Sequence, residues 1–336
     1  MSNPRTITVR IPRLRRLRTV LATAAAVVIG AGVVTYAISR PTIGRAYDRV
    51  STGSRIAESR CGPIEYAEAG EGPPVLVVHG AGGGFDQGLD LGESLSRGGY
   101  HVIAPSRFGY LRTPVPADAS AAAQADAHAC LLDALKIDRA VVLGVSAGGP
   151  SSMQLALRHP DRTAALVLLV PATYAPRPDT AQPKRMTRTS AFLFDTALRS
   201  DVLFWAASKV ARQTFIRAVL GTPPEVVARA SADERARIQL VLERILPVRP
   251  RRQGLLNDAT VVSTLPRYEL EKITAPTLAI STADDQYGTF DGARYTAEHV
   301  PNGRFVGYPS GGHMLVGRDA AASAEVNAFL KSAARF

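Results

Sequence analysis

A serine flanked by glycines carries the clearest chemical signal in this chain of 336 residues. Ser146 is the centre of a Gly-Val-Ser-Ala-Gly run, between an apolar segment predicted as a strand over 140–145 and a helical pattern over 147–158. A sharp strand-to-helix turn holds such a serine with its hydroxyl free above the end of a sheet. The dipole of the following helix favours the negative charge that develops when the hydroxyl attacks a carbonyl. The spacing therefore predicts a nucleophilic serine.

A serine hydroxyl is a weak nucleophile until a base takes its proton, and His313 is the predicted base. It ends a Ser-Gly-Gly-His run in a loop after the predicted strand 304–308, where glycines let the imidazole reach the serine. An acid is needed to orient the imidazole, and both Asp284 and Asp285 follow the predicted strand 277–281. The other five histidines are interpreted as structural or solvated: His79, His101, His128, His159 and His299.

A glycine-rich segment after the first predicted core strand is expected to supply backbone N–H donors. It runs His-Gly-Ala-Gly-Gly-Gly over 79–84 and lacks the Gly-Lys-Ser/Thr ending of a phosphate-binding loop. The N–H of Ala81 and the N–H of Ala147 are predicted to bind the oxyanion that forms during attack, with Gly82 as the alternative donor on this loop. His79 is expected to brace the loop.

These groups need a scaffold, and the chain supplies a regular alternation of strand and helix patterns. A hairpin of one or two strands is predicted over 55–69. Repeated β-α units predict a mostly parallel sheet covered on both sides by helices, with the long, Arg-rich helical segment 171–275 inserted over one edge. Further strands are predicted over 75–79, 100–104, 140–145, 165–170, 277–281 and 304–308, and helices over 85–97, 119–135, 147–158, 289–299 and 319–333.

Together these motifs resemble the α/β-hydrolase superfamily over about residues 60–336. The shared pieces are the His-Gly-x-Gly loop, the Gly-x-Ser-x-Gly turn, the Ala-Pro-Thr-Leu-Ala-Ile strand with its acid and the Gly-Gly-His loop. The chain order of serine, acid and histidine is also that of this superfamily. Members carry the acid as Gly-x-x-Asp, and Thr282 stands at the glycine position here, so the resemblance implies Asp285 as the acid, with Asp284 as the alternative.

The resemblance implies an α/β-hydrolase fold with a mostly parallel central sheet flanked by helices. Its core would comprise residues 55–170 and 276–336, and residues 171–275 would form a helical cap inserted after strand 6, over the site. Acyl transfer at such a site needs no cofactor, and the sequence shows no metal-binding cluster.

The N-terminus predicts a membrane segment. Six arginines lie in the basic tail 1–18, ahead of an uncharged run over 19–38 that is long enough to cross about 30 Å of hydrocarbon as a helix. This run exceeds the apolar region of a signal peptide, so an uncleaved anchor is favoured, with cleavage and secretion as the alternative. The arginine excess predicts a cytoplasmic N-terminus and an extracytoplasmic catalytic domain, joined to the span by a linker over 39–54.

The net charge of +11 is distributed unevenly along the chain. Residues 1–40 carry seven basic and no acidic side chains, and residues 171–275 carry 17 basic and 10 acidic ones. This placement favours a membrane surface, and no motif for binding nucleic acid is present. The cluster Arg249, Arg251 and Arg252 is interpreted as a solvated face, or as one that lies along anionic headgroups.

Two cysteines exclude a disulfide-dense scaffold. Cys61 lies in a predicted early strand and Cys130 in a helical pattern, and spacing alone does not bring their Cα atoms within bridging range. Two buried thiols are expected in preference to a disulfide.

The function predicted from these features is a membrane-anchored serine hydrolase that cleaves carboxylic esters through an acyl-enzyme. Its partners would be a small-molecule or lipid-like ester and the membrane, without nucleic acid. Two alternatives stay open. The same triad can serve carbon–carbon or amide bond hydrolysis, perhydrolysis or acyl transfer, or the fold can be that of a non-catalytic ligand-binding protein.

Overall fold

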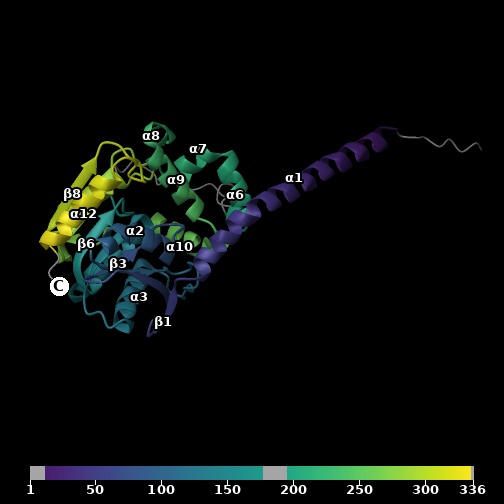
Figure 1. The fold of residues 1–336 in the computed structure, drawn as a ribbon. Coiled ribbons are helices and arrows are strands. Elements are labelled where there is room, and N and C mark those ends of the chain that lie inside the picture. Colours follow the sequence, from purple (N-terminus) through teal and green to yellow (C-terminus); the bar gives the residue numbers. More distant parts are fainter. Residues whose placement is uncertain (1–11, 177–194, 334–336) are drawn as a thin grey trace, which may run out of the picture.

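The structure, a computed structural model, describes residues 12–176 and 195–333 (Figure 1). Its eight-stranded sheet has the order β1-β2-β4-β3-β5-β6-β7-β8. β2 is antiparallel to both its neighbours, and the remaining pairs are parallel, so the N-terminal hairpin and the mostly parallel sheet are confirmed. The strands are β1 (Arg55–Ser59), β2 (Gly62–Ala69), β3 (Pro74–Val78), β4 (His101–Pro105), β5 (Ala140–Val145), β6 (Thr163–Leu169), β7 (Thr277–Thr282) and β8 (Gly303–Tyr308).

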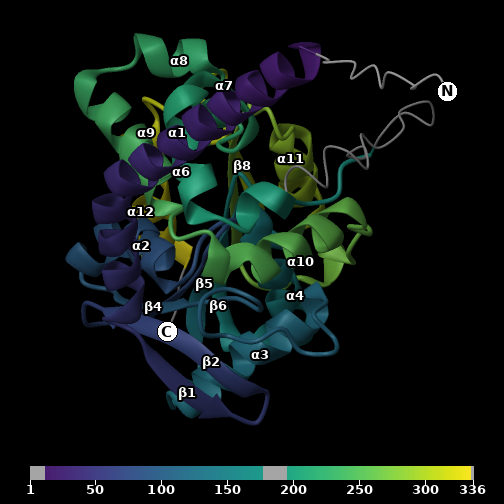
Figure 2. The same cartoon turned by 90° about the vertical axis from the view of Figure 1, so that its right-hand side faces the viewer.

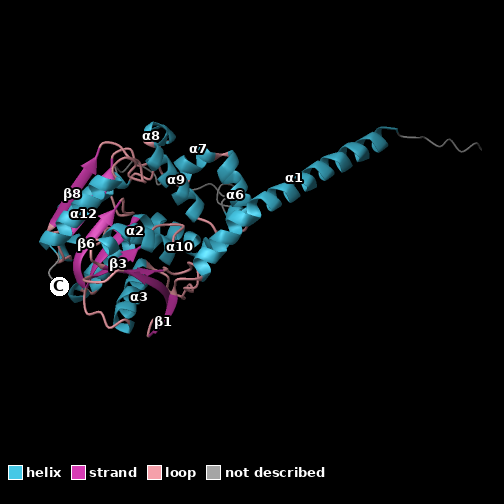
Figure 3. Cartoon of the chain, viewed as in Figure 1, coloured by secondary structure: helices cyan, strands magenta, loops and turns pink. Residues whose placement is uncertain are grey.

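Helices cover both faces of this sheet (Figure 3). The central strands are apolar at successive positions because side chains that point to either face are buried: Leu76 and Val77 are both fully enclosed. Leu76 packs with the helices of one face and Val77 with those of the other. The first face carries α3 (Ala121–Ala134), α4 (Gly149–Arg158) and α11 (Thr289–His299), and the second carries α2 (Phe85–Arg97) and α12 (Asp319–Ala333).

From residue 195 onward, the described part of the segment between β6 and β7 is mostly helical, as the sequence predicts for the cap. It has an apolar cluster of its own, which includes Phe204, Ile216, Leu242 and Ile245. Figure 2 shows the cap helices beyond the ends of the central strands, with the N-terminal helix crossing in front of them. The cap helices are α6 (Asp201–Val210), α7 (Arg212–Ala218), α8 (Pro224–Arg229), α9 (Ala232–Arg244) and α10 (Arg252–Ser263).

The prediction of a linker over 39–54 is wrong, because α1 continues as one helix over Pro12–Ser51. One face of its last three turns packs against the domain, and Ser39, Ala46 and Val50 are buried there. This packing stabilises a helix that Pro41 and Gly44 would otherwise weaken. The helix from Thr19 onward is long and apolar enough for a membrane span or a signal sequence, and Figure 1 shows it projecting from the domain.

The expectation of two buried thiols is also wrong, because Cys61 and Cys130 form a disulfide. Cys61 lies in the turn between β1 and β2, and Cys130 lies on α3. The hairpin packs on α3 and brings the two Cα atoms to 6.1 Å, within bridging range. This proximity arises from tertiary packing across 69 residues of sequence.

Candidate active site

Ser146 lies in a strained turn at the end of β5. Its φ is +51°, a left-handed conformation that a residue with a side chain rarely adopts. The two glycines of the motif permit this turn. A Cβ on Gly144 would lie 2.4 Å from Oγ of Ser152, and one on Gly148 would lie 2.5 Å from the carbonyl oxygen of Val78. The turn therefore presses against β3, which places the serine beside the glycine-rich loop that follows that strand.

The serine, one histidine and one aspartate form a continuous chain of hydrogen bonds. Oγ of Ser146 lies 2.8 Å from Nε2 of His313, and Nδ1 of His313 lies 2.7 Å from Oδ2 of Asp285. His313 and Asp285 are buried, at 4% and 7% exposure, whereas Ser146 is half-exposed. A carboxylate only accepts hydrogen bonds, so Nδ1 carries the ring proton and Nε2 is free to take the proton of the serine.

Asp285 is held in place by other donors. Its Oδ1 accepts the backbone N–H of Tyr287 at 2.8 Å, and its Oδ2 also accepts the hydroxyl of Thr289. The Thr289 hydroxyl is in turn 2.8 Å from Oγ of Ser281 on β7. These bonds fix the carboxylate against the imidazole.

The neighbouring acid, Asp284, has a different task. Its carboxylate accepts the backbone N–H groups of Gly311 and Gly312, at 3.2 and 2.7 Å. It therefore anchors the loop that carries His313 without touching the imidazole. The structure places Asp285, and not Asp284, in the position of the orienting acid.

The predicted oxyanion donors lie on either side of the serine. A Cβ built on Gly80 would be 3.1 Å from Cβ of Ser146, so the glycine-rich loop passes directly beside the nucleophile. Ala147 lies in the first turn of a short 3₁₀ helix, Ser146–Gly148, where amide N–H groups have no acceptor within the helix. Gly82, the alternative donor, gives its N–H to the hydroxyl of Tyr110 at 3.2 Å. Among the described residues, the N–H of Ala81 has no such acceptor.

A model of the alpha/beta hydrolase fold family matches residues 73–319, which is well over half of the sequence. The chain belongs to the α/β hydrolase family. This confirms the resemblance and the prediction of an enzyme of hydrolase type.

Two of the most similar curated proteins are hydrolases. Over 279 residues the chain is 26% identical to an uncharacterized hydrolase, YcgS, of Bacillus subtilis (strain 168), covering 79% of this chain and 93% of the relative. Over 105 residues it is 37% identical to the 2-hydroxymuconate semialdehyde hydrolase of Pseudomonas putida. That second match covers 30% of this chain and 37% of the relative.

Solved structures share the whole fold. An alpha/beta hydrolase fold protein from Nakamurella multipartita is 28% identical, with a TM-score of 0.65 over 83% of this chain and 99% of that one. An esterase from Exiguobacterium antarcticum is 20% identical, with a TM-score of 0.61 over 82% of this chain and 98% of its own, and it shares the fold.

In this hydrolase, His79 braces the glycine-rich loop. Its Nε2 accepts the backbone N–H of Arg107 at 3.0 Å, so Nδ1 carries the proton and donates to the carbonyl of Gly80 at 2.7 Å. Burial, followed by the charge of Arg107, lowers the pKa of His79 well below its ordinary value. His79 is therefore a neutral structural histidine, as the sequence predicts.

A buried ion pair, which sequence reasoning missed, joins this loop to the cap. The guanidinium of Arg107 donates to both oxygens of Asp258 on α10, at 2.6 and 2.7 Å, and to the carbonyls of His79 and Gly80. Tyr110 donates its hydroxyl to the same carboxylate at 2.5 Å. Arg107 lies two residues after the end of β4, which is a signal that could have been used. Asp258 lies 151 residues away, on an ordinary helix.

The arginine cluster of the cap is solvated only in part. Arg251 is fully buried and donates to both oxygens of Asp86 on α2 and to the carbonyl of Gly83. Arg252 pairs with Asp195, and Arg249 is exposed. The interpretation of this cluster as a surface along headgroups is therefore wrong for Arg251, because a carboxylate inside the protein already compensates its charge.

The cap also contacts the histidine loop. The carbonyl of Gly221, between α7 and α8, accepts the backbone N–H of His313 at 3.2 Å and that of Gln286 at 2.9 Å. Oγ1 of Thr222 accepts the N–H of Met314 at 3.1 Å. The positions of the base and its loop thus depend on the cap as well as on the sheet.

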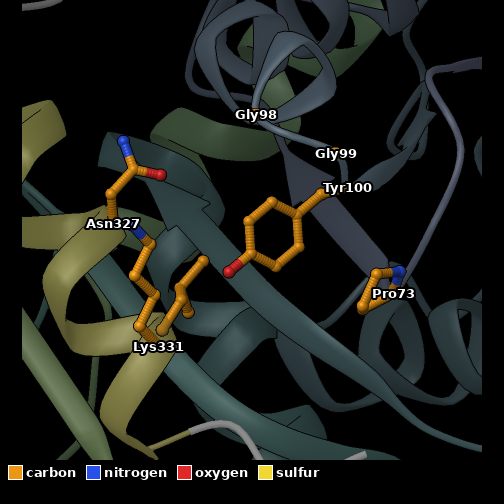
Figure 4. A pocket seen from close by; sticks show the side chains of 7 residues that line it. Pro73, Gly98, Gly99, Tyr100, Asn327 and Lys331 are labelled. Carbon is orange, nitrogen blue, oxygen red and sulfur yellow. The ribbon is translucent and has the colours of Figure 1, made fainter.

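The remaining histidines are all engaged away from the serine: His101 with Glu68, His128 with Ser151, His159 with Asp126 and His299 with Tyr295. A hollow of about 520 Å³ also lies apart from the site (Figure 4). In it, the ring of Tyr100 faces Asn327 and Lys331. Tyr100 precedes β4, whereas Ser146 follows β5, so the hollow and the candidate site lie at opposite ends of these parallel-oriented strands.

Proposed function

We propose that this protein is a membrane-anchored serine hydrolase that cleaves carboxylic esters, including lipid-like ones, through an acyl-enzyme at Ser146. The observation that carries the proposal is the unbroken hydrogen-bond chain from Oγ of Ser146 through His313 to Asp285, in a strained turn beside free backbone N–H groups. These are the parts that nucleophilic acyl transfer needs.

The geometry gives each residue a step. Nε2 of His313 takes the proton of Ser146 as Oγ attacks the ester carbonyl, and Asp285 stabilises the imidazolium that forms. The N–H groups of Ala81 and Ala147 receive the oxyanion. His313 then protonates the alcohol that leaves. Water attacks the acyl-enzyme with His313 again as base, which releases the acid and restores the serine.

The membrane part of the proposal rests on the N-terminal helix. Six arginines precede its apolar stretch, which favours a cytoplasmic N-terminus and a catalytic domain on the other side. The disulfide between Cys61 and Cys130 supports that location, because disulfides persist in oxidising compartments outside the cytosol. Intact mass of the protein isolated from membranes, with residues 1–40 present, is the expected result, and a shortened mass would indicate secretion after cleavage.

A second candidate is carbon–carbon bond hydrolysis with the same triad. It is favoured by partial matches to hydrolases of 2-hydroxymuconate semialdehyde and of 2-hydroxy-6-oxo-6-phenylhexa-2,4-dienoate. The second compound has a ketone and a carboxylate but no ester, so its hydrolysis breaks a carbon–carbon bond. Turnover of such a dienoate faster than of any ester in a series of rising acyl length would favour this candidate.

The deciding experiment is labelling by a fluorophosphonate, with Ser146→Ala and, as the matched control, Ser332→Ala on the exposed end of α12. We expect labelling of the wild type and of Ser332→Ala. Ser146→Ala should lose labelling and about 10⁴-fold or more of the esterase kcat. Equal labelling of all three proteins would place the reactive group at another residue and contradict the proposal. No labelling of a folded wild type would contradict it and favour a binding protein.

A further inference from the structure

The apolar stretch of α1 that stands free of the domain is shorter than a bilayer requires. Side-chain contact with the domain begins at the half-buried Thr35 and is complete at Ser39, which is fully buried. Residues 19–34 make about 24 Å of helix at about 1.5 Å per residue, whereas the hydrocarbon core is about 30 Å thick and needs about 20 residues. The turn 35–38, alongside the domain, must supply the rest, and Arg40 follows as the first cation.

The element that packs against α1 on the domain side is α6. Of the domain's elements, α6 has the most extensive contact with α1, and Oδ2 of Asp201 at its start accepts the hydroxyl of Tyr47 at 2.9 Å. Figure 1 shows α6 next to α1 where the long helix leaves the domain, with the sheet on the far side. A bilayer that encloses the apolar stretch of α1 therefore meets the domain first at α6.

The outward face of α6 has the composition of a helix that lies in a membrane interface. Leu203 and Val210 are seven residues apart, hence on one face, and are 54% and 90% exposed. Three exposed cations flank this stripe: Arg212, and Lys209 and Arg217, which pair with Glu243 and Glu225. Asp201 is the only acidic residue over 201–218, and it is buried. An apolar stripe flanked by Lys and Arg is typical of interfacial helices that bind anionic lipid.

We propose that α6 and the start of α7 form a bilayer-contacting face of the cap. Leu203 and Val210 enter the boundary between headgroups and acyl chains, and Arg212 meets anionic phosphates. The inference rests on the proposed membrane anchoring and goes beyond it, because it fixes which side of the enzyme touches lipid. Behind this face, the apolar cluster of the cap runs from Phe204 to Leu220, next to the Gly221 carbonyl that holds the His313 loop.

The test uses single cysteines in the full-length chain. Both native cysteines are in the disulfide, so an introduced one is the free thiol that a fluorophore labels. Leu203→Cys and Val210→Cys report on the face, Val27→Cys reports on the span, and Val262→Cys, 40% exposed on α10, is the matched control in the domain. Each labelled protein is reconstituted into vesicles of phosphatidylcholine and phosphatidylglycerol that carry no quencher, a shallow nitroxide on the lipid, or a deep nitroxide near the end of the acyl chain.

We expect the shallow nitroxide to quench the labels at 203 and 210 about twofold, because interfacial side chains lie only about 5–10 Å deep. The deep nitroxide should quench the label at 27, which lies in the middle of the span, while the label at 262 stays bright with both. In phosphatidylcholine alone, or with Arg212→Glu, quenching at 203 should weaken, whereas Arg294→Glu on α11 should leave it unchanged. Quenching at 27 without quenching at 203 and 210 would overturn this inference and leave the anchor intact. Quenching at 262 to the same extent would also overturn it.

Two further outcomes distinguish the proposed lipid contact of α6 from the proposed membrane anchor on which it rests. No quenching at 27 would overturn the anchor and this inference together, independently of fluorophosphonate labelling at Ser146. A label at 203 that emits as in an apolar environment but is unreachable by lipid quenchers would show that a protein, such as a second copy of the chain, covers the face. That result would replace the proposed lipid contact.

Discussion

Asp258→Ala should loosen the glycine-rich loop although it lies on a cap helix. The substitution removes the acceptor of two hydrogen bonds from Arg107 and one from Tyr110. Arg107 and Asp258 are each 5% exposed, so water does not replace the lost carboxylate. Burial, together with the Asp258 carboxylate, raises the pKa of Tyr110 well above its ordinary value, so this phenol stays protonated and must find another acceptor.

The size of the effect follows from the burial of the pair. Burial by itself disfavours the charge of Arg107, but the carboxylate of Asp258 outweighs it and raises the pKa of the guanidinium. Leaving a buried charge without its partner costs about 3–5 kcal/mol, a large part of the about 5–15 kcal/mol that stabilises a domain. This corresponds to a fall of about 10 °C in the melting temperature. Because Tyr110 also holds the N–H of Gly82, kcat should fall by about 10- to 100-fold, less than the loss of a whole oxyanion donor.

The assay measures the melting temperature together with kcat and KM on a short soluble ester. Glu93→Ala is the matched control: it also removes a carboxylate paired with an arginine, Arg97, but both side chains are more than half exposed. Such a pair contributes about 0.3–0.5 kcal/mol, so the control should melt close to the wild type. If Asp258→Ala melts like Glu93→Ala and keeps its kcat, the reasoning about the buried pair is refuted.

Asp285→Asn should lower kcat by about 10⁴-fold through loss of the correct imidazole tautomer. Asp284→Asn, whose side chain touches only the loop that carries His313, should lower kcat by about 10- to 100-fold. Equal losses in ester turnover would contradict these roles. Gly148→Ala should abolish fluorophosphonate labelling or folding, because its Cβ would lie 2.5 Å from a carbonyl oxygen of β3, and a labelled, stable variant would be unexpected. Burial, and then the charge of Arg107, lowers the pKa of His128 to about 3 in the folded protein, whereas its unfolded pKa is about 6.5. The free energy of unfolding should therefore fall by about 1.4 kcal/mol for each pH unit below pH 6.5. His128→Gln should lose less of its melting temperature than the wild type between pH 7 and pH 4.5.

The core strands could be predicted from sequence because their burial leaves a local trace. Every side chain of β3 from Val75 to Val78 is enclosed, so the run is apolar throughout and its ends are marked by Pro74 and Gly80. The positions of Ser146 and His313 were predictable for a related reason. Each lies in a short motif whose glycines are required by local backbone geometry, at the carboxyl end of a strand.

The features that could not be predicted depend on partners far away in sequence. Nothing near Asp258 distinguishes it from an acid on a solvated helix, and its partner lies 151 residues earlier. The disulfide also depends on a partner far away in sequence. Cys61 is exposed, and only the packing of the β1–β2 hairpin on α3 brings it to Cys130. Asp284 and Asp285 differ by one residue at the end of a strand, and the conformation of the turn decides which one meets the imidazole.

The continuation of α1 through the expected linker changes what an anchor does in this molecule. Arg49, near its end, donates to Asp86 and to the carbonyl of Leu246, and Asp86 also binds Arg251 of the cap. Burial alone would raise the pKa of Asp86, but the two arginines outweigh it and lower the pKa, so the carboxylate stays charged. Arg251 also holds the carbonyl of Gly83. One carboxylate thus joins the N-terminal helix, the cap and the glycine-rich loop, and a helix fixed in a membrane would also fix the orientation of the active site.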